Sequence, residues 1–64
     1  MKLYKVPEGS KIRVTEDTPG PPGEPIYKKG TELKFGHIDG MYSVCFDDNG
    51  NRVYLPGYSE VVCI

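Results

Sequence analysis

Apolar and polar residues alternate along several short segments of this chain, which is the pattern of β-strands that bury one face. Residues 11–16 alternate in this way, and residues 31–35 do so again. Both segments are therefore predicted strands. The apolar positions that should face the core in these two strands are Ile12, Val14, Leu33 and Phe35.

Residues 41–46 predict a third strand, in which Tyr42, Val44 and Phe46 share one face. Gly36 and the pair Asp39-Gly40 bracket a short connection before it. After it, Asn49-Gly50 predicts a two-residue type I′ turn, because both central positions of that turn need positive φ. The return strand then covers residues 52–55, which should run antiparallel to the third strand.

The remaining segments carry Pro and Gly signals. Residues 18–25 hold four prolines and two glycines, which exclude a helix and a central strand and predict an exposed loop. Pro56-Gly57 should end the fourth strand, residues 58–60 suit one 3₁₀ turn, and residues 61–64 form a last strand. No stretch has the helical period, so the chain is expected to be one all-β domain over residues 1–64. The predicted core consists of Val14, Leu33, Phe35, Val44, Phe46, Leu55 and Val61.

Charge changes this picture little. Eight Lys and Arg residues are spread among nine Asp and Glu residues, the formal net charge is −1, and only Lys28 and Lys29 are adjacent. Because nonspecific nucleic-acid binding usually shows clustered basic residues, this distribution argues against a nucleic-acid partner. No apolar run approaches the ~20 residues of a membrane span, and residues 1–8 lack the apolar segment of a signal peptide. A cytoplasmic protein without a membrane partner is expected.

Candidate chemistry is sparse. Cys45 and Cys63 lie in apolar surroundings and predict two buried, reduced thiols. One histidine, His37, with two distant cysteines does not supply four zinc ligands, and residues 47–51 lack the spacing of a calcium loop. No nucleophile motif accompanies the histidine. The sequence therefore predicts no catalytic residue, no metal and no cofactor, and argues against an enzyme.

The order of the predicted elements resembles the SH3-like β-barrel superfamily. Residues 18–29 are similar to its long RT loop, Gly40-Met41-Tyr42-Ser43-Val44 to its aromatic strand start, and Tyr54-Leu55-Pro56 to its Tyr-Ile-Pro. The resemblance implies a small five-stranded SH3-like barrel with a long Pro/Gly-rich loop after the first strand. There is no tryptophan, so Met41 or Tyr42 would replace the one that lines the family's peptide groove.

The resemblance also implies a ligand surface between the long loop and the Pro-Gly-Tyr turn. In this chain that surface would join Pro21, Pro22, Glu24, Met41, Tyr54, Pro56 and Tyr58. Flat apolar area with carboxylates at its rim suits a basic or apolar protein partner. The leading interpretation is a non-enzymatic protein-interaction domain, similar to the small accessory proteins with which bacteriophages bind and modulate a host protein. The alternative is an SH3-like barrel that binds RNA or DNA through Lys28, Lys29, Lys34 and Arg52.

Overall fold

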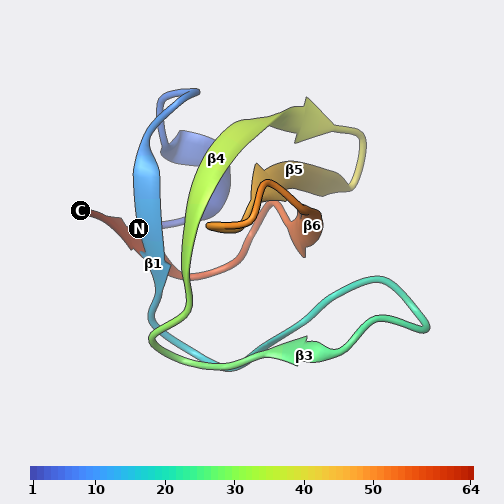
Figure 1. Cartoon of the computed structure of the whole chain (residues 1–64). Helices are drawn as coiled ribbons and strands as arrows, with labels where there is room; N and C mark the ends of the chain where they lie inside the picture. Colours follow the sequence, from blue (N-terminus) through green and yellow to red (C-terminus); the bar gives the residue numbers. More distant parts are fainter.

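The computed structural model describes residues 1–64 and consists mainly of β-strands, with no α-helix (Figure 1). The predicted all-β class is confirmed. The elements in chain order are the 3₁₀ helix η1 (Leu3–Lys5) and the strands β1 (Lys11–Val14), β2 (Thr18–Pro19), β3 (Ile26–Tyr27), β4 (Glu32–Asp39), β5 (Tyr42–Phe46), β6 (Arg52–Pro56) and β7 (Val61–Cys63). No helix has the length and apolarity of a membrane-spanning segment.

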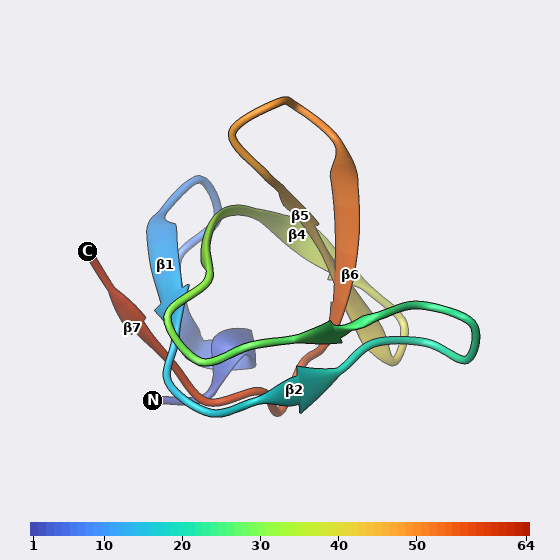
Figure 2. The same cartoon turned by 60° about the horizontal axis from the view of Figure 1, so that its bottom comes forward.

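Five strands form one antiparallel sheet in the order β6-β5-β4-β1-β7, and β2 pairs with β3 in a separate ribbon. The sheet curves, but its edge strands β6 and β7 do not pair with each other (Figure 2). The prediction of a five-stranded barrel is therefore wrong in two respects, because there are seven strands and the sheet is not closed.

The two additional strands arise at the base of the predicted Pro-rich loop. Thr18 pairs with Tyr27 and Pro19 pairs with Ile26, and the backbone N–H of Lys29 donates to Oδ1 of Asp17 at 2.8 Å. A two-stranded ribbon has free edges, where a proline costs no ladder hydrogen bond. Only the middle of the segment is a loop, and β2 lies beside β6.

Strand β4 is longer than predicted. The expected connection after Gly36 is wrong, because His37, Ile38 and Asp39 continue the strand and pair with β5. A β-bulge between residues 35 and 37 absorbs the register shift at Gly36. A tight turn after Asp39 leads directly into β5, and Gly40 has a φ of 67° there, which glycine adopts at little cost.

The core contains most of the predicted residues but differs in β5. Ser43 and Cys45 are fully buried, whereas Phe46 is only partly buried. Val44 is buried but lies outside the core cluster. The predicted inner face of β5 was wrong by one residue, because this strand carries apolar or small side chains on both faces and alternation does not distinguish them. The core cluster is Leu3, Val6, Ile12, Val14, Leu33, Phe35, Cys45, Val53, Leu55 and Val61.

The N-terminal segment also contributes, which the sequence pattern did not indicate. Leu3 is fully buried and its N–H donates to the carbonyl oxygen of Ser59 at 2.9 Å. Val6 completes the single turn of η1, with its N–H bonded to the carbonyl of Leu3 at 3.0 Å. One 3₁₀ turn is too short to produce a periodic pattern, so the two core residues were missed.

The β5–β6 hairpin is confirmed, but its turn differs from the predicted one. Gly50 has a φ of 82°, while Asn49 has no positive φ, so the turn is not type I′. The N–H of Gly50 donates to the carbonyl of Asp47 at 3.0 Å, and Oδ1 of Asp47 accepts from the N–H groups of Asn49 (2.9 Å) and Asn51 (2.8 Å). The carboxylate of Asp47 thus organises a longer loop with one left-handed glycine.

Three further corrections concern the last third of the chain. Strand β6 ends at Pro56, one residue later than the predicted end at Leu55. The predicted 3₁₀ turn is a single hydrogen-bonded turn in which the N–H of Ser59 donates to the carbonyl of Pro56 at 3.0 Å. Cys45 is buried but Cys63 is exposed. Cys63 lies near the end of the edge strand β7, opposite Ile12, where no further strand covers it.

Candidate functional site

Gly57 is a junction at which three segments of the chain meet. Its N–H donates to the carbonyl of Met41 at 3.4 Å, and its carbonyl accepts from the N–H of Tyr4 at 2.8 Å. These bonds join η1, the β4–β5 turn and the turn after β6. Because the backbone is tied at all three points, side chains that project from here are held on a common framework.

The large side chains at this junction are strongly exposed. Tyr4 is 53% exposed, Met41 81% and Tyr58 68%. The ammonium of Lys5 lies over the Tyr4 ring, 5.9 Å from the ring centroid. We call Tyr4, Met41 and Tyr58 the turn patch. Large exposed apolar side chains on neighbouring backbone segments are a common feature of interaction surfaces.

The turn between β6 and β7 presents Tyr58 outward. Ser59 is buried, and its hydroxyl donates to the carbonyl of Pro56 at 2.6 Å. Pro56 is itself buried and pairs with Tyr42 of β5. With the residues on both sides anchored inside the domain, the intervening Tyr58 is the one that faces solvent.

A shallow cavity of about 210 Å³ adjoins Tyr58. Three of its eight lining residues carry a carboxylate, namely Glu16, Asp17 and Glu60, and one, Lys2, carries an ammonium. The other lining residues are Thr18, Pro19, Tyr58 and Ser59. The cavity therefore joins the turn patch to the segment that leads into the ribbon.

Of the three carboxylates in this cavity, Glu60 and Asp17 form ion pairs and Glu16 does not, and the N-terminal ammonium lies 3.7 Å from Glu60 as well. Nζ of Lys2 lies 2.6 Å from Oε1 of Glu60, and this contact holds the pKa of Glu60 below its usual range and raises the pKa of Lys2. Asp17 lies 3.8 Å from the ammonium of Lys28. Glu16 forms no ion pair. An added cation would therefore find negative charge at this position.

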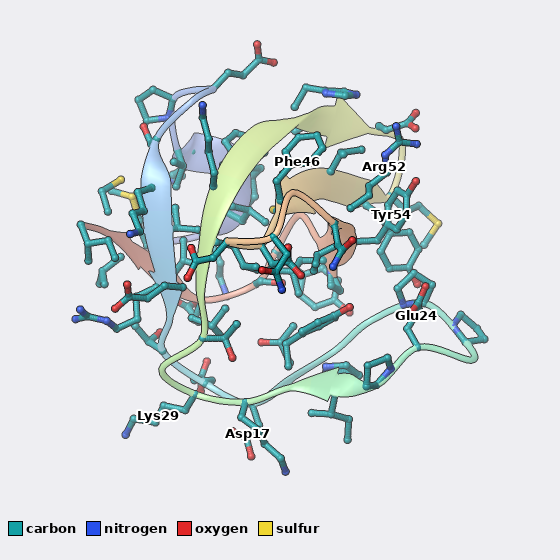
Figure 3. All side chains as sticks on the ribbon, viewed as in Figure 1. Asp17, Glu24, Lys29, Phe46, Arg52 and Tyr54 are labelled. Atoms are coloured by element: carbon teal, nitrogen blue, oxygen red, sulfur yellow. The ribbon has the colours of Figure 1, made fainter.

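The predicted ligand surface divides into two groups in the structure. Met41 and Tyr58 lie at the Gly57 junction, with Pro56 buried beneath the turn. Tyr54 lies instead beside the ribbon loop, since a Cβ on Gly20 would be 3.3 Å from both the Tyr54 carbonyl and Cβ of Glu24. Figure 3 shows Glu24 and Tyr54 near one another on this side. Pro21 and Pro22 belong to the same loop, where Pro21 is partly buried and Pro22 is exposed.

Sequence reasoning missed Tyr4, Lys2 and Glu60 as parts of this region. Tyr4 belongs to η1, a single turn that is too short to give a periodic sequence pattern. Lys2 pairs with Glu60 through an isolated β-bridge between the two ends of the chain. Local patterns carry no signal for such a contact. The exposed tyrosine at position 58 was the feature that could be identified.

The four basic residues of the alternative interpretation do not form one cluster. Lys28 and Lys29 flank Asp17 near the ribbon, while Lys34 lies in the middle of β4 and Arg52 begins β6. In Figure 3, Lys29 and Arg52 lie on opposite sides of the domain.

Other candidate groups stand apart from the turn patch. His37 is exposed on β4. Burial raises the pKa of the Cys45 thiol to about 11, so it is protonated at neutral pH. No three His, Cys, Asp or Glu side chains are grouped so that they could hold a metal ion.

Comparison with known proteins gave no matching family model, no matching curated protein and no matching solved structure.

Proposed function

We propose that this chain is a non-enzymatic protein-binding domain and that its partner docks on the turn patch. The observation that carries the proposal is the convergence of Tyr4, Met41 and Tyr58 on the hydrogen-bonded junction at Gly57. Tyrosine and methionine are enriched in protein interfaces. A rigid backbone beneath them supports the proposal further, because little conformational entropy is lost when a preorganised surface binds.

The adjoining cavity favours a partner that presents a basic side chain next to an apolar one. Three carboxylates and one ammonium line it, and Glu16 is unpaired. A lysine or arginine of the partner would compensate this charge while its aliphatic stem packs on Tyr58. The volume of about 210 Å³ is below the ~300 Å³ of typical small-molecule sites, which favours a side chain over a substrate.

The proposal includes an SH3-like relationship for the fold and a bacteriophage accessory role in the host cytoplasm. The sheet order β6-β5-β4-β1-β7, with a ribbon between its first two strands in sequence, supports the SH3-like relationship. The bacteriophage role, with a host protein as partner, rests on the resemblance described for the sequence.

The test begins with the immobilised protein and a bacterial lysate, followed by an affinity measurement with the purified captured protein. Tyr58→Ala should weaken binding by more than about 1 kcal/mol, roughly fivefold or more in Kd, as expected for an interface tyrosine. Glu16→Gln should weaken it less and reduce its dependence on salt. Thermal melts of each variant establish that the fold is retained.

Two controls separate this surface from others. Ile26→Ser removes an apolar side chain that is similarly exposed but lies on the ribbon, and it should leave the affinity unchanged. Lys28→Glu with Lys29→Glu changes the basic edge. If that double variant abolishes binding while Tyr58→Ala does not, the partner recognises the basic edge and the proposed surface is wrong.

A further inference from the structure

A row of cationic and aromatic side chains crosses the outer face of the sheet. Lys11 of β1 pairs with Lys34 of β4, Lys34 pairs with Phe46 of β5, and Phe46 pairs with Arg52 of β6. Directly paired residues project from the same face of a sheet. Each of the four is followed or preceded by a core residue that points inward, namely Ile12, Phe35, Cys45 and Val53. The row therefore faces away from the core.

Positive charge in this row is poorly compensated. Lys11 and Lys34 are directly opposite each other, an arrangement that destabilises a sheet unless an anion lies between them. Lys11 has a distant contact with Glu32 at 3.8 Å, but neither Lys34 nor Arg52 forms an ion pair. The nearby carboxylate of Asp47 is occupied by the hairpin loop. The register has gathered three cations that are far apart in the sequence.

An aromatic platform lies between these cations. The ring of Phe46 rests over Gly36, where a Cβ atom would lie 2.9 Å from Cε2 of the ring. Phe46 as a residue is partly exposed. Beside it, Nη1 of Arg52 donates to the hydroxyl of Tyr54 at 3.4 Å, and Figure 3 shows Phe46, Arg52 and Tyr54 on the same side of the domain. The outer face thus carries an aromatic side chain that is paired with a cationic residue on each neighbouring strand.

The spacing between the cations of this row leaves room for one nucleotide. Lys34 and Arg52 are separated by two strand spacings, roughly 10 Å, with Phe46 between them. Bases of any sequence stack on aromatic rings, while phosphates are held by flanking cations. A base within a duplex is stacked on its neighbours and cannot reach a ring on a sheet face, so only an unpaired base fits.

We propose that this outer face of the sheet binds single-stranded nucleic acid, with one base stacked on Phe46 and the backbone phosphates held by Lys11, Lys34 and Arg52. The turn patch lies at the other end of strands β5 and β6, at the Met41–Gly57 contact. The inference is therefore independent of the proposed protein partner.

The test is fluorescence anisotropy with labelled single-stranded DNA and RNA of mixed sequence, about 12 nucleotides long, within the usual site size. Binding should be measurable at low salt. Three phosphate contacts predict a slope of about −2 for log K against log salt concentration. Lys34→Gln with Arg52→Gln should weaken binding at least tenfold and flatten this slope. The matched control, Lys28→Gln with Lys29→Gln, removes the same charge elsewhere and should change the affinity less than twofold.

Phe46→Leu tests the stacking, since it keeps an apolar side chain but removes the π-face, and it should weaken binding about fivefold or more. Tyr58→Ala should have no effect, which keeps this test separate from that of the protein partner. Two results with the unchanged protein overturn the proposal: no binding at low salt, or equally tight binding of blunt duplex DNA or polyglutamate. Two results with folded variants also overturn it: an equal loss of affinity in the Lys28/Lys29 control, or an unchanged affinity of Phe46→Leu.

Discussion

The side chain of Phe46 in β5 packs against the backbone of Gly36 in the neighbouring strand β4. A Cβ atom on Gly36 would lie 2.9 Å from Cε2 of Phe46 and also 2.9 Å from the carbonyl oxygen of Val44. Such distances are too short for a carbon atom, so the side chain of Phe46 occupies the space that glycine leaves open. The bulge in β4 occurs at this same residue.

Gly36→Ala should therefore destabilise the domain by about 1–3 kcal/mol, the usual cost of overpacking. Gly57→Ala is the matched control, because a Cβ there would meet its nearest atoms at 3.8 and 3.9 Å and would need no left-handed backbone. Urea denaturation of both variants measures the difference. Equal stability of the two variants would contradict the close contact.

Gly50→Val should lower the free energy of unfolding by about 1 kcal/mol or more, since a β-branched residue resists a positive φ. Asn49→Ala should be nearly neutral, because Asn49 has no positive φ. A two-residue type I′ turn would instead make both substitutions costly. Thermal melts of the two variants distinguish these turns.

Phe35→Ala and Phe46→Ala should differ in cost. Phe35 is fully buried, so its truncation should cost roughly 3–5 kcal/mol, comparable to the entire stability of a small domain. Phe46 is partly exposed on the outer face and should cost about half as much or less. Denaturant titrations of both variants test this assignment. A greater loss for Phe46→Ala would restore the strand phase that the sequence pattern predicted.

The two thiols should react at very different rates. Cys63 is exposed and Cys45 is buried, so a disulfide reagent should modify one thiol per chain quickly and the second only when the sheet opens. Cys63→Ser should remove the fast phase and leave the slow one. Two fast thiols in the native protein would show that β5 is not buried as described.

Burial of Cys45 also predicts a loss of stability at alkaline pH. Its pKa rises from 9.0 to about 11 in the folded state, so the folded state binds more protons than the unfolded state between these values. The contribution of the Cys45 thiol to stability is fully present below pH 9 and declines toward pH 11. The raised pKa of the partly buried Tyr27 acts in the same direction. Cys45→Ala should reduce the slope of unfolding free energy against pH in this range.

The pair of Lys2 and Glu60 predicts the opposite behaviour in acid. The pKa of Glu60 is lowered in the folded state, chiefly by its hydrogen bond to Lys2. Its contribution is present above the ordinary pKa of glutamate and is lost as pH falls through the lowered value. Lys2→Met should flatten this part of the pH–stability curve. An unchanged curve would mean that the contact has no energetic consequence.

Alternation located β1 and the first part of β4 because each has a distinct polar face, as in β1, where Ile12 and Val14 are buried between exposed neighbours. It failed in β5, where Ser43, Val44 and Cys45 are all buried and no period can be read. It also could not place Leu3, which reaches the core through a contact with Ser59 at the other end of the chain.

The candidate site shows the same division. Tyr58 was identified because its turn signals are local, whereas Tyr4 joins it only through the tertiary bond to Gly57. The sequence pattern did not reveal the row of cationic and aromatic side chains across the sheet, for a related reason. Lys34 and Arg52 are separated by most of a hairpin in the sequence, and only the register of β5 places both beside Phe46.

The position of β1 between β4 and β7 has a consequence for the order of folding. Strands β4, β5 and β6 are sequence neighbours and pair after short turns, whereas β1 meets β7 only after nearly the whole chain has closed into a loop. Loop closure of that length is slow relative to hairpin formation. We expect the β4–β5–β6 meander to form first and β7 to join last. In native-state hydrogen exchange, the amides of β7 and the N-terminal segment should therefore open together, before those of the meander.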